Sequence, residues 1–182
     1  DFRRSRGLGD VYKRQMQPGE ALELENFEPD IQGGYRRING FSKYVSAVVP
    51  QTASSSEPVL MVATFGDKVL AARGTSIFSA DPAGSSWTSI DSGRTSAGTY
   101  AFERYNFDGN NKIIFVDGAN APTFFNTSLS ATDVSNSDVT GSKFVAAFKS
   151  HMFYAGKSSA PQTLVFSQPF DEDAFSSGSG AG

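Results

Sequence analysis

The sequence predicts an all-β fold, a partial β-propeller-like array of about three antiparallel four-stranded blades that forms part of a larger protein. A strand–turn–strand unit with a central glycine occurs three times, at Gly74, Gly118 and Gly156, with spacings of 44 and 38 residues. A period of about 40–50 residues built from short strands is typical of propeller blades. Sixteen Phe, six Tyr and one Trp can fill a core, and eighteen Gly and eight Pro suit many tight turns. Because a closed propeller needs at least four blades, we expect the array to be incomplete.

Composition narrows the classes of function. The chain contains no Cys, which excludes disulfides and thiolate metal sites and suits folding in a reducing cytosol. Its apolar runs are far shorter than the roughly 18 residues of a membrane span, and no signal peptide is visible, so we expect no membrane anchor. We expect no cofactor, and no catalytic, cofactor-binding or metal-binding residues.

Residues 1–15 share no pattern with the rest of the chain. They resemble sequencing-adapter read-through, so we expect this segment to be artefactual or disordered. Its cluster of five basic residues leaves a nucleic-acid-binding arm as the alternative. Without it, 11 basic and 17 acidic residues remain, a net charge of −6. The acidic body argues against a general DNA-binding surface, because binding to phosphates requires a basic footprint.

Residues 16–58 predict an N-terminal element of strands and turns. Its first turn, over residues 30–34, contains Gly33 and Gly34, which accept positive φ without a Cβ penalty. The features expected after this turn are an extended segment (35–38), a second turn (Asn39-Gly40), a strand (45–49) and a Ser-rich loop (52–58).

Residues 59–175 predict the blade-like repeats. Asp108-Gly109-Asn110-Asn111 is a strong hairpin signal, because Asp, Gly and Asn tolerate left-handed turn geometry. The Gly/Ser-rich residues 176–182 contain no closing strand, and we expect the chain to be truncated there. The expected strands cover 59–65, 68–72, 75–80 and 87–90 in the first repeat, 100–107, 112–116 and 123–126 in the second, and 143–148, 151–155 and 163–167 in the third.

Three segments carry a family resemblance. Residues 25–41 read ENFEPDIQGGYRRINGF, residues 113–125 read IIFVDGANAPTFF, and residues 148–156 read FKSHMFYAG, continued by 164–170 and 173–175. Together they span nearly all of residues 16–182. They resemble the β-propeller-containing neck and tail structural proteins of short-tailed bacteriophages, the nozzle or tail-tube class.

The resemblance implies a virion structural protein without enzymatic activity, part of the tail nozzle or head–tail junction channel through which DNA exits. It implies a homo-oligomeric ring that contacts the portal, the adaptor and other tail proteins, lets genomic DNA pass without specific binding, and is assembled in the host bacterial cytoplasm. An acidic lumen suits that passage, because it does not trap DNA. The residues expected to matter are structural: Gly33, Gly34, Gly40, Gly118 and Gly156 in turns, Phe115, Phe153 and Phe166 in inter-blade packing, and Arg36 and Arg37 as a candidate subunit contact.

Two other functions stay open. An adhesin could bind a cell-surface glycan through exposed aromatics such as Trp87 and Tyr105. A sialidase-like glycosidase would need an arginine cluster for a carboxylate substrate and a carboxylate acid/base. Its candidates are Arg73, Arg94 and Arg104 with Asp91 or Glu103, although nothing in their spacing favours the cluster.

The remaining motifs have structural interpretations. Residues 79–87 resemble the Asp-box turn of sialidase-type propellers, with one extra residue between Asp81 and Gly84, and predict a fold-stabilising turn between strands. The single histidine, His151, has no Gly-x-Ser-x-Gly partner motif. Residues 171–173 lack the spacing of a calcium loop and predict a solvated acidic turn. Asn126-Thr127-Ser128 matches a glycosylation acceptor, which matters only in a secreted eukaryotic protein.

Overall fold

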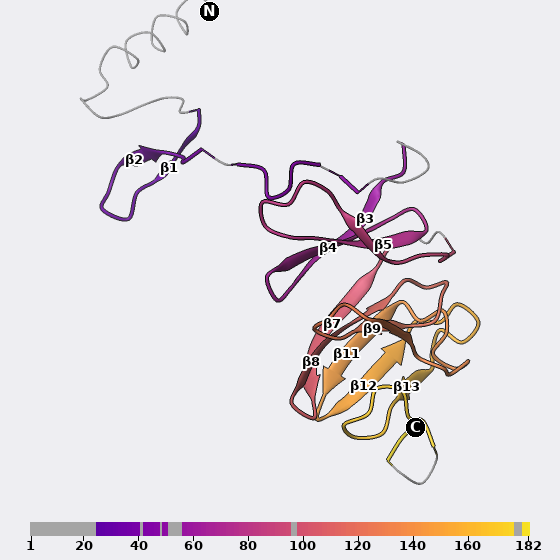
Figure 1. The fold of residues 1–182 in the computed structure, drawn as a ribbon. Coiled ribbons are helices and arrows are strands. Elements are labelled where there is room, and N and C mark those ends of the chain that lie inside the picture. The colour runs from indigo at the N-terminus through magenta and orange to yellow at the C-terminus, as the bar shows by residue number, and fades with distance from the viewer. Residues whose placement is uncertain (1–24, 41, 48, 51–55, 96–97, 177–179) are drawn as a thin grey trace, which may run out of the picture. The chain divides into compact units, whose positions relative to one another are not determined.

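The computed structural model describes residues 25–40, 42–47, 49–50, 56–95, 98–176 and 180–182, so the expectation for residues 1–15 lies outside it. This part of the chain is all-β, as predicted, and forms four antiparallel sheets. The chain divides into two compact units, Asp1–Ser42 and Lys43–Gly182 (Figure 1). Across the described ranges, no helix is long and apolar enough to cross a membrane.

The first unit contains a hairpin of β1 (Phe27–Pro29) and β2 (Tyr35–Arg37). The turn predicted over residues 30–34 is confirmed. Gly33 and Gly34 have φ of 91° and 81°, and the Gly33 amide donates a 3.0 Å hydrogen bond to the Asp30 carbonyl. The second predicted turn is wrong, because Asn39 and Gly40 lie in irregular chain and Gly40 does not have a positive φ.

The second unit contains three meander sheets in chain order (Figure 1). Within each sheet, every strand pairs with the strand that follows it in the chain. The first sheet is β3 (Val59–Phe65), β4 (Lys68–Arg73), β5 (Ser76–Ala80) and β6 (Thr88–Asp91); the second is β7 (Ala101–Phe107), β8 (Asn110–Val116), β9 (Thr123–Phe125) and β10 (Ala131–Asp133); the third is β11 (Phe144–Phe148), β12 (His151–Ala155) and β13 (Leu164–Phe166).

The repeated turn glycines occupy the same place in all three sheets. Gly74, Gly118 and Gly156 follow the second strand of their sheets, with φ of 59°, 81° and 79°. The predicted hairpin between β7 and β8 is also confirmed, since Asp108 and Gly109 form a two-residue loop with φ of 56° and 78°. Positive φ at both loop residues matches the right-handed twist of the flanking strands.

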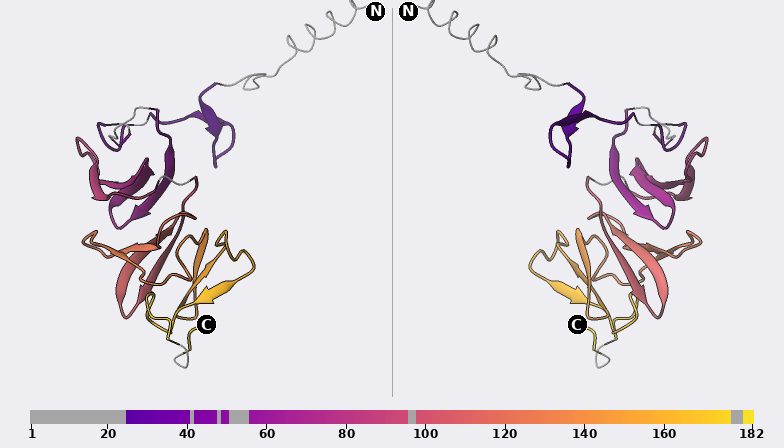
Figure 2. Two further views of the ribbon diagram at one scale, coloured as in Figure 1. Left: turned by 90° about the vertical axis from the view of Figure 1, so that its right-hand side faces the viewer. Right: turned by 90° about the vertical axis from the view of Figure 1, so that its left-hand side faces the viewer.

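The second sheet packs between the other two, and the alternation of β8 explains how (Figure 2). Successive strand residues point to opposite faces. Ile113 and Phe115 therefore lie in the core shared with the first sheet, whereas Ile114 and Val116 lie in the core shared with the third. All four side chains are almost fully buried.

Residues 43–47 and 49–50, which we call the strap, lie along β4 on the outer face of the first sheet. At one end the Tyr44 hydroxyl donates to the Asp67 carbonyl at 2.6 Å, and at the other Arg73 donates to the Pro50 carbonyl. Val45 and Pro50 are buried. The strand predicted over 45–49 is wrong for the residues described there, because the strap's backbone bonds go to the β5–β6 turn instead of to a strand.

In its described residues, the third sheet contains the three strands predicted for this repeat, and so has fewer strands than the four expected of a blade. Gly182 lies beside β13, where its amide donates a 3.1 Å bond to the Phe166 carbonyl and its carbonyl accepts from the Phe166 amide. Conversely, β10 in the second sheet is a strand that the sequence does not predict. The three sheets do not close into a propeller.

Candidate functional site

A buried polar cluster joins the first sheet to the second. Arg94, which follows β6, donates from Nε and from an Nη to one Asp117 carboxylate oxygen, at 3.2 and 2.8 Å. Its other Nη donates to Asp91 at 2.9 Å and to Thr123 at 2.7 Å. The Arg94 side chain is 5% exposed and that of Asp117 is fully buried.

The guanidinium of Arg94 has no donor left for a ligand. An arginine side chain carries five N–H donors. Arg94 makes five hydrogen bonds, the last from Nη to the Ala121 carbonyl at 3.4 Å. The cluster can therefore hold the β6–β7 connection against the β8–β9 loop, but it cannot bind a substrate carboxylate without breaking that connection.

The Asp117 carboxylate is held ionised. Burial would raise its pKa, but hydrogen bonds from the Asn120 amide, from Arg94 and from the Ala119 amide together lower the pKa below its ordinary value. The Asn120 and Ala119 amides donate at 2.8 and 2.9 Å. Opposite charge and donated hydrogen bonds both favour the charged form of a carboxyl group.

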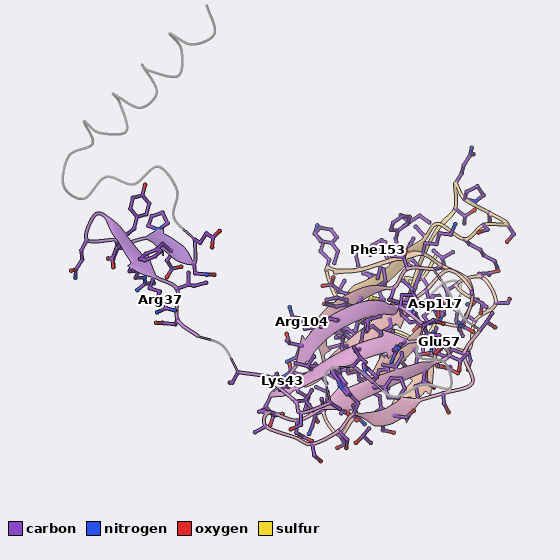
Figure 3. The ribbon with its side chains drawn as sticks, turned by 90° about the horizontal axis from the view of Figure 1, so that it is seen from above. Arg37, Lys43, Glu57, Arg104, Asp117 and Phe153 are labelled. Carbon is purple, nitrogen blue, oxygen red and sulfur yellow. The ribbon has the colours of Figure 1, made fainter. Side chains whose placement is uncertain are left out.

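The three arginines of the sialidase hypothesis do not converge. Arg73 donates to the carbonyls of Glu57 and Pro50, and Arg104 donates to Thr64. Arg94 belongs to the Asp117 cluster. Figure 3 shows Arg104 well apart from Asp117. The structure therefore places each arginine in a separate set of contacts.

The aromatic pair of the adhesin hypothesis is also placed differently from expectation. Tyr105 is not exposed but 7% accessible, because it lies on the face of β7 that packs toward the third sheet, with its ring 4.8 Å from that of Phe107. Trp87 is half-buried, and its indole donates to the Ala47 carbonyl of the strap at 2.8 Å. Within the segment 79–87, residues 81–87 form the predicted turn between β5 and β6.

The acidic segment 171–173 is not a solvated turn as a whole. Glu172 is buried and forms an ion pair with Lys112 of β8, and its carbonyl accepts a 3.0 Å hydrogen bond from the Tyr154 hydroxyl. Its neighbour Asp173 accepts from the Ser135 amide at 2.8 Å. Among the described residues, no three acidic or histidine side chains gather as a metal site. The sequence missed the Lys112–Glu172 pair because its members are 60 residues apart.

The three phenylalanines predicted to pack between blades divide into two groups. Phe115 is fully buried in the core between the first and second sheets, as predicted. Phe153 and Phe166 are wrong as inter-sheet contacts, since they lie on the opposite face of the third sheet from its core residues Met152 and Tyr154. Their rings contact each other there, with centroids 5.5 Å apart. His151 joins this group, with its ring 5.7 Å from that of Phe166.

The arginine pair of the hairpin is split between two roles. Arg36 pairs across the hairpin with Glu28, at 2.7 Å. Arg37 is exposed, and its side chain has no hydrogen-bond or ion-pair partner within the described part of the chain. Adjacent strand residues point to opposite faces, which separates the two side chains.

An open cavity of about 400 Å³ lies where the ends of β3 and β4 approach those of β7 and β8. Its polar lining is largely engaged within the protein. Lys68 pairs with Asp81, Arg104 donates to Thr64, and the side chains of Asn106 and Asn111 bond to each other at 3.0 Å. Comparisons of the chain with protein-family models, with curated proteins and with solved structures find no match.

Proposed function

We propose that this protein is a structural component of a short-tailed bacteriophage tail, and that it assembles as a homo-oligomeric ring in the nozzle or head–tail junction through which DNA leaves. The proposal rests on the resemblance of segments 25–41, 113–125 and 148–175. The observation that supports it most is the repetition of one meander sheet three times, with consecutive sheets packed face to face. For the arrangement of the sheets, we propose that they are blades of a propeller-like array.

The buried polar groups fit a mechanical role. Arg94 with Asp117 joins the first and second sheets, and Lys112 with Glu172 joins the second to the C-terminal segment. Both pairs connect elements far apart in the sequence, and breaking either would leave a buried charge without a partner. In this role, the charges resist separation of the sheets and perform no chemistry.

The hairpin of β1 and β2 fits a contact with a neighbouring subunit. A two-stranded hairpin is at best marginally stable by itself. Its large apolar side chains are exposed, from 41% at Ile38 to 100% at Ile31. We propose that a neighbouring subunit covers this hairpin in the ring, and that Arg37 pairs with an acidic side chain there. The net negative charge of the chain supplies such partners.

The test is imaging of the purified full chain by negative-stain electron microscopy, with mass measured by light scattering. We expect annular particles with a central channel, which Arg37→Glu reduces to smaller species while Arg36→Gln has a weaker effect. A chain that stays monomeric at all concentrations, without affinity for tail or portal proteins, contradicts the proposal. Specific glycan binding that is lost in Trp87→Ala would favour the adhesin instead.

A further inference from the structure

The third sheet has one covered and one uncovered face. Val145, Ala147, Met152, Tyr154 and Val165 point toward the second sheet. The alternate residues of the same strands point the other way and form a continuous surface, which we call the open aromatic face. Its residues are Phe144, Ala146, Phe148, His151, Phe153, Ala155, Leu164 and Phe166.

This face is apolar and accessible. Phe144, Phe148 and Leu164 are 64%, 62% and 57% exposed. The rings of Phe148 and Phe153 lie 6.5 Å apart, and that of Phe166 continues the row. Isolated exposed apolar residues are ordinary on a protein surface, but a contiguous apolar patch marks an interaction site.

The corresponding faces of the other two sheets are covered. The same side of the second sheet, with Ile114 and Val116, packs against the third sheet. On the outer face of the first sheet, Ala71 and Phe78 are buried on the side along which the strap runs, while Val62 of the edge strand β3 is exposed. On the open aromatic face, the C-terminal residues Gly180 and Gly182 lie beside His151 and Phe166. Phe144, Phe148 and Leu164 stay more than half exposed, without a cover from the described residues.

The size of the face fits a dimer contact. Because an aromatic side chain carries about 150–250 Å² of surface, the exposed parts of its residues amount to roughly 400 Å² of apolar area. A standard protein–protein interface buries about 800 Å² on each partner, somewhat more than half of it apolar. The open aromatic face therefore has the dimensions of the apolar part of such an interface.

The chemistry of the face suits an identical partner. None of its own residues is Lys, Arg, Asp or Glu, and the Lys149 ammonium of the β11–β12 turn lies 5.5 Å from the Phe148 ring centroid at one end of the face. Over the rest of the face, two copies of an acidic chain can approach without direct charge repulsion. Large and small residues alternate, with Ala146 opposite Phe153 and Ala155 opposite Phe144. Two such surfaces can interdigitate, as the inner faces of packed sheets do.

We propose that the open aromatic face is a homodimer interface, in which the third sheets of two copies pack face to face about a two-fold axis. A two-fold contact uses the same patch on both subunits, which is what a self-complementary, uncharged face offers. The contact follows from this face alone and does not require the tail function.

The first test measures the mass of the full chain by analytical ultracentrifugation across a wide concentration range. We expect a monomer–dimer equilibrium that Phe148→Ser weakens by roughly 30-fold or more, as for an aromatic hot spot. Val62→Ser is the matched control, because Val62 is 60% exposed on β3 and lies outside the open aromatic face. The control should dimerise as the unchanged chain does. A chain that stays monomeric, or equal effects of the two substitutions, overturns the proposal.

The second test leaves the aromatic residues in place. The chain contains no Cys, so Ala146→Cys supplies a single thiol on the face, and Val62→Cys supplies one away from it. Packed sheets lie about 10 Å apart, within reach of a bis-maleimide cross-linker. We expect rapid dimer cross-linking of Ala146→Cys and little of Val62→Cys. The reverse order, or equal yields, overturns the two-fold arrangement. Rings that lack this cross-link would support the proposed tail function and contradict the dimer proposal. Cross-linked dimers that form no rings would support the dimer and contradict the tail function.

Discussion

The Arg94 guanidinium grips one carboxylate oxygen of Asp117 with two hydrogen bonds, at 2.8 and 3.2 Å. The two residues are 23 positions apart and follow strands of different sheets, Arg94 after β6 and Asp117 after β8. The second oxygen of Asp117 accepts the Ala119 and Asn120 amides, so the loop after β8 is shaped around the same carboxylate. The pair thus fixes both the loop and its distance from the first sheet.

Removing Arg94 should destabilise the fold strongly. Arg94→Ala leaves the Asp117 carboxylate buried without its cation, and breaking a buried pair in this way costs about 3–5 kcal/mol. Arg94→Lys keeps the charge but offers three donors in place of the five that Arg94 uses, and should recover only part of the loss. Urea unfolding of the three proteins measures the difference. Arg104→Ala, at an exposed arginine, is the control and should cost under about 1 kcal/mol.

The Asp117 carboxylate should make stability depend on acid pH. Its pKa is lowered in the folded protein, so its contribution is complete above the unfolded value of about 3.9 and is lost as pH falls toward the folded pKa. Between about pH 5 and pH 2, the unfolding free energy of the unchanged chain should fall faster than that of Asp117→Asn. The difference between the two slopes should be about that of one titrating carboxyl group. Parallel curves for the two proteins would contradict this role of Asp117.

Loss of the hydroxyl should affect stability differently at two buried tyrosines, Tyr154 and Tyr105. The Tyr154 hydroxyl donates to the Glu172 carbonyl at 3.0 Å, whereas that of Tyr105 is buried without a hydrogen bond to any described residue. Tyr154→Phe should therefore cost about 1 kcal/mol, while Tyr105→Phe should be neutral or slightly stabilising. Thermal melting of the two variants is sufficient. A larger loss in Tyr105→Phe would show that its hydroxyl has a partner in solution.

The same two tyrosines should weaken the fold at alkaline pH. Burial is the main cause that raises the pKa of both hydroxyls, so the folded state keeps them neutral while the unfolded chain ionises above about pH 10. Stability should be unaffected below that pH and should fall above it. The double variant Tyr105→Phe/Tyr154→Phe should lose less unfolding free energy over this range. Denaturant unfolding between about pH 8 and 11 measures the difference.

Gly156 should tolerate alanine less well than Gly66. Both have positive φ, at 79° and 61°, which costs an L-residue about 1–2 kcal/mol. A Cβ at Gly156 would lie 2.7 Å from the Phe144 ring, whereas nothing lies within 4 Å of one at Gly66. Gly156→Ala should therefore cost about 1 kcal/mol more than Gly66→Ala. Equal losses in denaturant would mean that the Phe144 ring moves aside freely.

The sequence predicts the strands well where apolar residues alternate between turn glycines. It places β3 and β12 at their observed bounds, because both strands have one face in a core. It misses β10, whose three residues are all exposed and carry no apolar pattern. It also predicts a strand at residues 45–49, where the apolar run is used to cover a sheet instead of extending one.

The sequence predicts the positions of the strands better than it predicts which sheet faces are buried. Phe115 and Phe153 follow the same pattern in equivalent repeats, yet one is buried between sheets and the other lies on an uncovered face. The alternation of apolar residues shows on which face of a sheet a side chain lies, but it does not show which element packs against that face. Arg94 and Asp117 escaped prediction for a similar reason, since their contact depends on how the β6–β7 connection is routed.

The strap over the first sheet gives the stack of sheets a direction. A fourth meander could be designed to pack against the exposed Phe144 and Phe148 of the third sheet, if it leaves in place the contacts that residues 167–176 and 180–182 make with the second and third sheets. A meander placed against the outer face of the first sheet would first have to displace Tyr44, Val45 and Pro50, and would break the hydrogen bond from Arg73 to the Pro50 carbonyl. A further sheet is therefore easier to add beside the third sheet than beside the first.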